Sequence, residues 1–355
     1  MAEAPASPHA PVREAWLAQV QEPILEPELP IIDAHHHLWD RPGQRYLLPE
    51  YLADTGSGHR ILASVYVQCR SMYSADRAAP FDAVGEVEFA AGIAAQSASG
   101  LYGESRLCAA IVAGADLRQG EGIVPVLEEM QARSGGRLRG IRNATAWHGD
   151  PRLVSNPRPP PAGILMDERF REGVACLARH DLSLDIWAYH TQLDEVLALA
   201  RRFPDQLIVL DHFGGPLGAG PYAQQRQTVF QEWSRVIQAL SRCSNLRLKL
   251  GGLGMKVGGF AFDERATPPS SAELADLWRP YVLTCVEAFG AERCLFESNF
   301  PVDKGMFSYG VLWNAFKRLT QGWDKDDRAA LFSGTAKDTY RLSSNSRSAV
   351  VTARS

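Results

Sequence analysis

Short apolar runs alternate with longer amphipathic stretches along most of the chain. Eight of these runs are rich in β-branched or large apolar residues, which is typical of strands buried in a parallel sheet. They occupy residues 31–39, 61–69, 107–115, 138–146, 182–189, 207–213, 246–252 and 294–300. Strands that recur in this way, with helix-like stretches between them, predict a parallel α/β fold.

The stretches between the runs have the composition of helices. We expect helices within residues 81–98, 120–134, 166–180, 191–203, 222–243, 271–290 and 325–342. Eight strands alternating with helices favour a single closed (β/α)8 TIM barrel. A doubly wound open sheet is the alternative, but it usually has a glycine-rich first turn, and the motifs GxGxxG and GxxxxGK[ST] are both missing.

The overall composition is that of an ordinary globular protein. Of the 355 residues, 45% are hydrophobic and 22% are charged, which is enough apolar material for one large core. We predict a barrel domain over residues 30–342, an N-terminal extension over residues 1–29 and a C-terminal tail over residues 343–355. Both ends are expected to be poorly ordered. The proline-rich segment 156–165 is interpreted as a long loop.

Charge and cysteine content exclude several classes of protein. The net charge of −4 gives no basic footprint for nucleic acid, and no apolar run approaches the eighteen residues of a membrane helix. The N-terminus lacks the features of a secretory signal, so we expect a cytoplasmic protein. The six cysteines are scattered without a C-x-x-C pair, which indicates reduced thiols. The oligomeric state cannot be read from the sequence.

Polar residues gather at the carboxyl ends of seven of the eight predicted strands. In barrel enzymes this end of the sheet carries the chemistry. The residues are His35 and His37, Gln68, Arg142 and Asn143, His190, Asp211 and His212, Lys249, and Glu297 and Asn299, with Asp303 just beyond. A purely structural barrel does not need this pattern, which therefore predicts a site for a small-molecule substrate.

Strand parity divides the triplet His35–His36–His37. Alternate side chains share a face, so His35 and His37 point the same way, with Asp33 one layer below them, and His36 points toward the helices. An H-x-H pair on one strand can place two imidazoles on one metal ion, with Asp33 orienting a ring. By the same argument Asp211, of opposite parity to His212, is assigned a structural role.

Three segments resemble motifs of the amidohydrolase superfamily, in its amidohydrolase-2 branch. "IIDAHHHLWD" is similar to the first-strand motif, "VLDHFGGP" to the sixth-strand motif, and "LFESNFPVD" lies where the eighth-strand motif belongs. The Trp39 after the histidines is typical of the lactonase-like subgroup, which includes sugar lactonases and 2-pyrone-4,6-dicarboxylate lactonase. The resemblance spans residues 30–340. It implies a TIM barrel that hydrolyses a lactone or cyclic ester, with His35, His37 and His212 as site histidines.

The eighth-strand motif departs from the family pattern. Many relatives have "SDWP", whose Asp activates water, and this chain has "SNFP", which places Asn299 there. A neutral amide cannot accept a proton at neutral pH. The candidates for a replacement base are Asp303, on the loop after Pro301, and Glu297, one layer deeper on the strand. We favour Asp303.

These observations predict a hydrolase that acts on a small anionic lactone or cyclic ester. The three histidines would polarise the carbonyl, directly or through a metal ion, and a carboxylate would activate water. Arg142 and Lys249 would bind the anionic substituent, and His190, Asn299 and Gln68 would complete the substrate-binding set. The alternatives are a decarboxylase or isomerase of the same superfamily, and a non-catalytic ligand-binding barrel.

The metal content is left open by the sequence. His35, His37 and His212 suit one divalent ion such as zinc or manganese. No anionic ligand is evident once Asn299 replaces the aspartate of the family motif, which tilts the expectation toward weak or absent metal. The pyrone lactonase type of the subgroup works without a metal.

Overall fold

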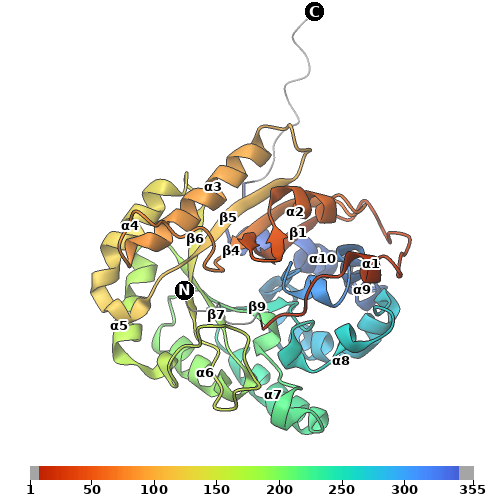
Figure 1. Ribbon diagram of the computed structural model, residues 1–355. Helices are drawn as coiled ribbons and strands as arrows, with labels where there is room; N and C mark the ends of the chain where they lie inside the picture. Colours follow the sequence, from red (N-terminus) through yellow and green to blue (C-terminus); the bar gives the residue numbers. More distant parts are fainter. Residues whose placement is uncertain (1–7, 344–355) are drawn as a thin grey trace, which may run out of the picture.

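Eight parallel strands form one sheet in the computed structural model, which describes residues 8–343 (Figure 1). The strands are β1 (Ile31–His36), β4 (Ile61–Val67), β5 (Arg106–Gly114), β6 (Leu138–Ala144), β7 (Ser183–Trp187), β8 (Ile208–Leu210), β9 (Leu246–Leu250) and β10 (Cys294–Phe296). Each pairs with the next in chain order. All eight predicted runs therefore contain a strand.

The first and last strands meet where the chain continues beyond β10. The amide of Asn299 donates to the carbonyl of His35 at 2.9 Å, and the amide of His37 donates to the carbonyl of Phe300 at 2.7 Å. A bridge between His36 and Phe300 lies between these bonds. These contacts close the sheet, which confirms the predicted single (β/α)8 barrel and excludes the open-sheet alternative.

The helices lie around the strands in chain order, as the colour sequence in Figure 1 shows. They are α2 (Leu48–Thr55), α3 (Val84–Ala98), α4 (Val124–Arg133), α5 (Glu168–Arg179), α6 (Leu193–Arg202), α7 (Arg226–Leu240), α8 (Ser271–Phe289), α9 (Tyr309–Leu319), α10 (Lys325–Ala329) and α11 (Thr335–Thr339). Every predicted helical stretch contains one of them. The sequence analysis missed α2 and α9, although Ser308 caps α9 by accepting from the amide of Val311.

A short hairpin follows β1 and was not predicted either. Its strands are β2 (Trp39–Arg41) and β3 (Gln44–Tyr46), which pair antiparallel to each other. The guanidinium of Arg41 stacks over the ring of Trp39 and donates to the carbonyl of Cys69 at 2.8 Å. The hairpin is thereby fixed beside the carboxyl ends of β1 and β4.

A β-bulge in β1 changes which residues face the barrel interior. Between Asp33 and His36 the chain of β1 advances three residues, while the partner strand advances two, from Ser64 to Tyr66. An extra residue in one strand reverses the alternation of side chains. Ala34 packs in the interior cluster, and the next residue, His35, also contacts groups inside the barrel.

The bulge corrects the expected role of Asp33. Its carboxylate accepts from the amide and hydroxyl of Ser298, at 2.8 and 2.6 Å, and from the hydroxyls of Tyr51 and Tyr309, at 2.9 and 3.0 Å. Tyr51 and Tyr309 belong to the helix layer, so Asp33 points outward and does not orient a histidine ring. It ties β1 to the segment after β10.

The interior of the barrel holds small apolar side chains around a buried polar core. Ala34, Val65 and Val112 are among the apolar members. From the amino-terminal end Tyr340 reaches in, and its hydroxyl donates to Asp185 at 2.6 Å. Asp185, on β7, in turn bonds to Lys249 on β9 at 2.8 Å. This places a polar chain along the barrel axis.

The N-terminal extension is more ordered than expected from residue 8 onward. Trp16 is buried in the short helix α1 (Glu14–Leu17), and its indole donates to the carbonyl of Arg265 at 3.1 Å. Further along, Glu22 accepts from the amide of Ser271 at 2.7 Å. Apolar burial and specific hydrogen bonds offset the entropy of ordering this segment. The predicted disorder of residues 1–7 and 344–355 concerns residues outside those described.

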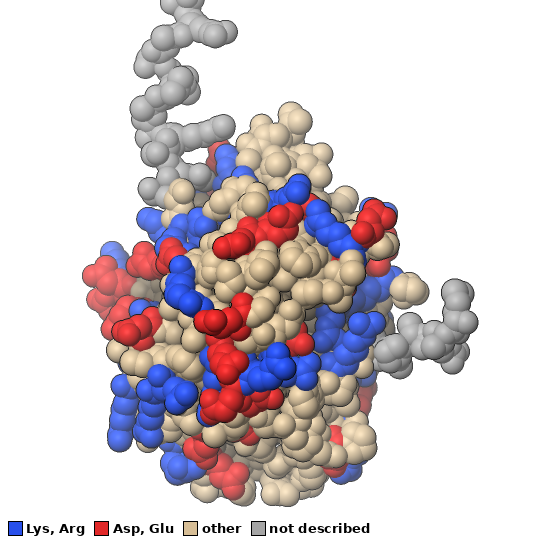
Figure 2. Space-filling model, turned by 90° about the vertical axis from the view of Figure 1, so that its left-hand side faces the viewer, with Lys and Arg blue, Asp and Glu red and all other residues tan. Residues whose placement is uncertain are grey.

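The mixed surface charge and the free thiols are as expected from the sequence. On the face shown in Figure 2, basic and acidic side chains are interspersed. The six cysteines are free, and four of them are buried. Within residues 8–343, the helices are too short or too polar to cross a bilayer.

Candidate active site

Three histidines lie together at the carboxyl end of the barrel. The Nε2 atoms of His35 and His37 are 3.2 Å apart, and the ring centroids of His35 and His212 are 4.7 Å apart. His36 points away and packs on Tyr51, with its Nε2 3.0 Å from the hydroxyl of Ser64. The predicted division of the triplet between His36 and the other two histidines is therefore present in the structure.

Glu297 connects two of these rings. Its Oε1 lies 2.6 Å from Nδ1 of His212, and its Oε2 lies 2.9 Å from Nδ1 of His35. Burial raises the pKa of this carboxyl, but the charges and hydrogen bonds of His212 and His35 outweigh burial and lower the pKa to about 2. Glu297 is thus a carboxylate held by its neighbours, which makes it a weak proton acceptor.

Contacts of their Nδ1 atoms fix the rings of His37 and His212. A carbonyl oxygen only accepts, so the 2.8 Å contact between Nδ1 of His37 and the carbonyl of Val67 requires a proton on Nδ1. The carboxylate of Glu297 also only accepts, so its contact with His212 requires a proton on Nδ1 of His212. Burial, followed by the charge of Arg142, lowers the pKa of His37 well below its usual range. A neutral His37 ring therefore presents an unprotonated Nε2 to the site.

Lys249 lies deeper, between two carboxylates and a ring. Its ammonium group is 2.8 Å from Asp185, 2.9 Å from Asp211 and 3.2 Å from Nδ1 of His35. Burial lowers its pKa, but the two carboxylates outweigh burial and raise the pKa well above the usual value. The side chain is fully buried, and two of its donors are taken by the carboxylates of Asp185 and Asp211. This burial between two carboxylates makes Lys249 a support for the site, against the substrate-binding role expected from the sequence.

Asp211 enters the site although the sequence analysis assigned it a structural role. Val209, two residues before it, faces the interior, and Asp211 continues that alternation. His212 then reaches the same side because its backbone turns into the left-handed region, with φ of 55°. The alternation of side chains between the two faces therefore does not continue from Asp211 to His212. The aspartate lies 3.7 Å from both His35 and the guanidinium of Arg142.

Arg142 lies at the edge of the cluster. Its Nη1 is 3.3 Å from Nε2 of His35, and its Nη2 donates to the backbone carbonyl of Gln68. Gln68 therefore supports the site through its backbone, while its side chain packs on Gly114, where a Cβ would lie 2.4 Å from Gln68 Cγ. The Arg142 side chain keeps 13% of its surface exposed, which makes it a cation of the site that solvent reaches.

A second buried carboxylate, that of Asp303, lies after β10 and is bonded to the side chain of Asn299. The Asn299 side chain donates to Oδ1 of Asp303 at 3.0 Å, and the amide of Gly254 donates to Oδ2 at 3.1 Å. Burial raises the pKa of Asp303 well above its usual range, despite these bonds. Of the two candidate bases, Asp303 is therefore the stronger proton acceptor.

His190 is not joined to the three histidines by any contact among the described residues. Its Nδ1 accepts from the amide of Leu217 at 3.3 Å, and its ring meets Tyr222 edge to face. Burial lowers its pKa to about 4. The structure places it beside the segment after β8, and its role in substrate binding stays a prediction.

Two glycines after Lys249 make room for the site side chains. A Cβ on Gly251 would lie 2.4 Å from Glu297 Cγ, and one on Gly252 would lie 2.5 Å from Nδ1 of His212. Gly252 also has φ of 77°. The sequence "KLGG" carried this signal, because a glycine pair at a strand end marks a close approach of other groups.

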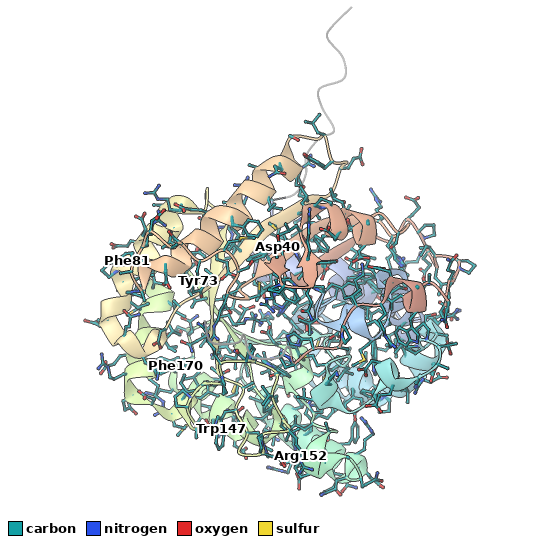
Figure 3. The ribbon with its side chains drawn as sticks, viewed as in Figure 1. Asp40, Tyr73, Phe81, Trp147, Arg152 and Phe170 are labelled. Carbon is teal, nitrogen blue, oxygen red and sulfur yellow. The ribbon has the colours of Figure 1, made fainter. Side chains whose placement is uncertain are left out.

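Aromatic residues surround the histidines on the outside. The ring of Trp39 stacks on His37 at 5.9 Å between centroids, and Trp187 meets His212 edge to face at 4.8 Å. Loops after β4 and β6 carry Tyr73 and Trp147, which Figure 3 labels around the end of the barrel. These rings supply an apolar rim to a polar centre, the usual composition of a small-molecule site.

The donor set fits a divalent cation. With the His35 proton on Nδ1, toward Glu297, the unprotonated Nε2 atoms of His35 and His37 face each other at 3.2 Å. Two lone pairs at this distance suit ligands of one ion with metal–nitrogen bonds of about 2.0–2.1 Å. His35, Asp211 and His212 also offer ligand atoms within 4.8 Å of one another. Asp211 is the anionic group that the sequence analysis did not find.

The chain is similar in sequence to known proteins over most of its length. The amidohydrolase family model, Amidohydro_2, matches residues 32–342. The uncharacterized protein y4mH of Sinorhizobium fredii is 30% identical over 89% of this chain and 99% of its own. An L-fucono-1,5-lactonase of Burkholderia ambifaria is 29% identical over 58% of this chain and 62% of its own.

A solved structure adds a three-dimensional match. The crystal structure of an amidohydrolase from Burkholderia multivorans with bound zinc has a TM-score of 0.67 and 26% identity, covering 88% of this chain and 99% of that chain. The family match extends over the whole barrel, from the strand that carries the histidine pair to α11. The chain belongs to the amidohydrolase family.

Proposed function

We propose that this amidohydrolase hydrolyses a small lactone or cyclic ester that carries an anionic or strongly polar substituent. The observation that carries the proposal is the convergence of His35, His37 and His212, with Nδ1 of His37 and of His212 engaged by a carbonyl and a carboxylate. Their Nε2 atoms are then available to a metal ion or to a substrate carbonyl. The lactonase relative from Burkholderia ambifaria supports the choice of a sugar 1,5-lactone as the first substrate class.

The metal requirement is part of this proposal. His35, His37, His212 and Asp211 would hold one divalent ion. When bound, such an ion supplies Lewis-acid polarisation of a carbonyl oxygen and acidifies a bound water. The protein holds the ligands in place: Glu297 orients His212 and His35, and Lys249 orients Asp211.

Asp303 is the proposed general base. Its raised pKa matches the requirement that a base hold the proton it takes from water. Its two accepted hydrogen bonds leave lone pairs on both oxygens, because a carboxylate can accept about four. Asn299, at the position of the family aspartate, would position this carboxylate by donating to it. Glu297 is the weaker candidate because its pKa is about 2.

Arg142 is the proposed anchor for the substituent. Its guanidinium is partly exposed, whereas the ammonium of Lys249 is fully buried between the carboxylates of Asp185 and Asp211. A guanidinium matches a carboxylate with two parallel hydrogen bonds. Arg142→Gln is therefore expected to raise KM for an anionic lactone more than for a neutral one.

A hydrolysis screen tests the proposed function. Purified enzyme supplied with zinc or manganese is incubated with sugar 1,5-lactones and with pyrone carboxylates, and ring opening is followed by proton release. We expect turnover of at least one lactone, abolished in His37→Asn. Release of carbon dioxide from a carboxylated substrate, without lactone turnover, would instead identify a decarboxylase, and binding without turnover would identify a non-catalytic barrel.

A further inference from the structure

A large hollow lies at the end of the barrel opposite the histidines. It is lined by the starts of β4, β5 and β6, including Ile61, Arg106 and Arg139, and by Arg341 after α11. The histidines lie at the other ends of their strands. The hollow has a volume of about 1160 Å³, which is enough for a small molecule.

The lining of this hollow, here named the basic cleft, is strongly positive. Six basic side chains contribute to it, against one acidic side chain, Glu104. The basic residues are Arg60, Arg106, Arg137, Arg139, Lys337 and Arg341. The whole chain is acidic, with 37 Lys and Arg against 41 Asp and Glu, so this local excess is not a result of composition. It also differs from the mixed surface in Figure 2.

Most of these cations lack a carboxylate partner among the described residues. Only Arg341 makes an ion pair, with Asp181 at 3.1 Å, and that carboxylate is 82% exposed. Arg106 and Arg137 donate instead to backbone carbonyls, of Glu104 at 2.9 Å and of Gly135 at 3.3 Å. Carbonyl oxygens orient a guanidinium without neutralising it. The positive charge of the cleft is therefore only partly compensated, chiefly by Asp181 at Arg341.

Arg139 is held by two backbone carbonyls. It donates to the carbonyls of Tyr340 and Leu138, each at 3.0 Å. Burial lowers its pKa, and the charges of Arg341 and Arg137 lower it further, while the charge of Asp181 opposes them. Like charges held near one another cost free energy unless an anion lies between them.

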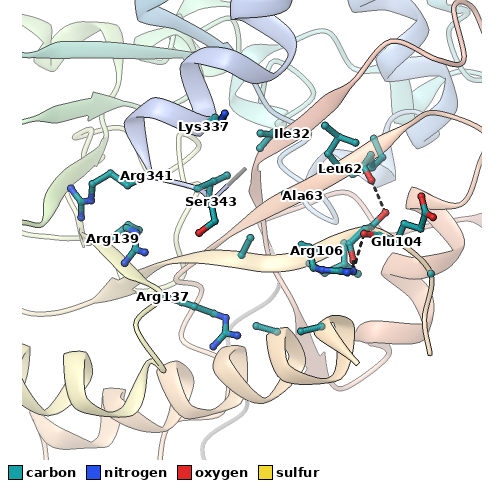
Figure 4. A pocket seen from close by; sticks show the side chains of 18 of the residues that line it. Ile32, Leu62, Ala63, Glu104, Arg106, Arg137, Arg139, Lys337, Arg341 and Ser343 are labelled. Atoms are coloured by element: carbon teal, nitrogen blue, oxygen red, sulfur yellow. Dashed lines mark hydrogen bonds between the residues drawn. The ribbon is translucent and has the colours of Figure 1, made fainter. Parts of the chain in front are cut away.

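Three glycines also line the cleft. Among the described residues, a Cβ added to Gly100, Gly103 or Gly136 would meet no atom within 4 Å. Figure 4 shows Arg139 and Arg341 on one side of the cleft and Arg106 on the other, with Ser343 between them. In this view Arg137 lies below Ser343 and Lys337 lies above it.

We infer that the basic cleft binds a small phosphate-bearing anion. A phosphate group offers several oxygens to guanidinium forks that approach from different strands, and two linked phosphates reach more of them than one. The source can be inorganic phosphate, pyrophosphate or a phosphate ester, since all present the same oxygens. This site is independent of the lactone site, because it lies at the other end of the strands.

Titration calorimetry and thermal melting of the full-length protein test the inference. The probes are inorganic phosphate, pyrophosphate and glucose 6-phosphate, added at constant ionic strength against sodium chloride. We expect saturable binding and a raised Tm, with pyrophosphate binding more tightly than phosphate. Tighter binding of the sugar phosphate than of phosphate would assign the ligand to the ester class. Absence of binding by all three probes at millimolar concentration would overturn the inference.

Two sets of variants locate the bound anion. The double variant Arg137→Gln, Lys337→Gln is expected to weaken pyrophosphate binding by about tenfold or more, since charged hydrogen bonds are lost. The control Arg201→Gln, Lys325→Gln removes the same charges from exposed helix positions and should bind as the wild type does. Arg142→Gln, at the histidine end, should also leave binding unchanged. Loss of binding in Arg142→Gln but not in the double variant would contradict the site.

Discussion

The Oε1 atom of Glu297 lies 2.6 Å from Nδ1 of His212, and both side chains are buried. The segment that follows β10 thus holds a ring from the segment after β8, across the neighbouring strand β9. Gly251 and Gly252 on that intervening segment are what allow the two side chains to meet. The position of the His212 ring depends on residues from three parts of the chain.

Replacing Glu297 by glutamine should impair the site without removing a base. The amide of Glu297→Gln cannot accept from both His35 and His212, so at least one ring loses its orientation. We expect kcat/KM to fall about 10–100-fold, as for other groups that orient metal-binding histidines. Glu232→Gln, on the exposed face of α7, is the matched control. Activity equal to wild type would show that Glu297 does not position the rings.

The same residue predicts how stability depends on acid. The folded-state pKa of Glu297, about 2, lies below the ordinary carboxyl value of 4.5, so its contribution is complete above pH 4.5 and is lost as pH falls through about 2. Urea unfolding between pH 5 and pH 3 should show a smaller loss of stability in Glu297→Gln than in wild type. Parallel pH profiles for the two proteins would contradict this sign.

Asp303→Asn should abolish most turnover and leave the fold intact. Removing a general base costs about 10²–10⁴-fold in rate. The raised pKa of Asp303 means that its contribution to stability is present below the ordinary carboxyl pKa and lost as pH rises through the raised value. The Tm of the variant relative to wild type should therefore be higher at pH 8 than at pH 4. Asp205→Asn, on an exposed turn, is the control, and wild-type kcat in Asp303→Asn would transfer the role of base to another group.

Lys249→Met should destabilise the barrel. Removing the ammonium leaves Asp185 and Asp211 buried at close range without their cation. Breaking a buried ion pair in this way costs about 3–5 kcal/mol in the free energy of unfolding. Urea denaturation measures it, with the exposed Lys325→Met expected to change stability by about 0.5 kcal/mol or less. Partial recovery at lower pH, where the carboxylates take up protons, is expected.

Asp33→Asn tests the connection between β1 and the segment after β10. The variant amide would place donors against the hydroxyls of Ser298, Tyr51 and Tyr309. We expect a loss of about 3 kcal/mol, because buried donors lose their acceptor, and about 1 kcal/mol for Tyr309→Phe, which removes one bond. The free energy of unfolding is measured in urea. Equal losses in the two variants would show that Asp33 does not accept hydrogen bonds from all three hydroxyls.

Metal analysis tests the proposed ligand set. Purified protein should contain about one divalent ion per chain, and chelation should lower activity that zinc or manganese restores. His37→Asn is expected to lower metal content, whereas the same change at His148, which is bonded to Tyr222, should not. Full activity in metal-free protein would mean that the histidines and Arg142 act on the substrate directly.

The order of the fold could be predicted from the sequence because it depends on periodic patterns. All eight apolar runs contain strands, and the histidine pair lies at the carboxyl end of the first strand as expected. The stretch that forms α9 directly follows the eighth-strand motif, and no helix was predicted for it. The N-terminal segment was missed because single contacts, such as that of Trp16 with Arg265, leave no periodic signal.

The direction of individual side chains could be predicted only where the backbone is regular. Parity assigned His36 correctly and failed for Asp33 and Asp211. The first failure comes from the bulge in β1 and the second from the left-handed backbone at His212. Asn299 has the same backbone geometry, with φ of 55°. Alternation therefore could not predict which side chain after β10 faces the site. Pairings such as Glu297 with His212 join distant residues and have no local signature.

The bulge in β1 separates two requirements that one strand has to meet. Ala34 fills the barrel core and His35, its neighbour, serves the site, so each is fixed by different surroundings. A regular strand would force the core residue and the site residue to alternate, and any change of register would move both. Because of the extra residue, two neighbouring positions of β1 both face the interior, one as a packing residue and one as a site residue. A single strand thereby supplies both layers without a second element.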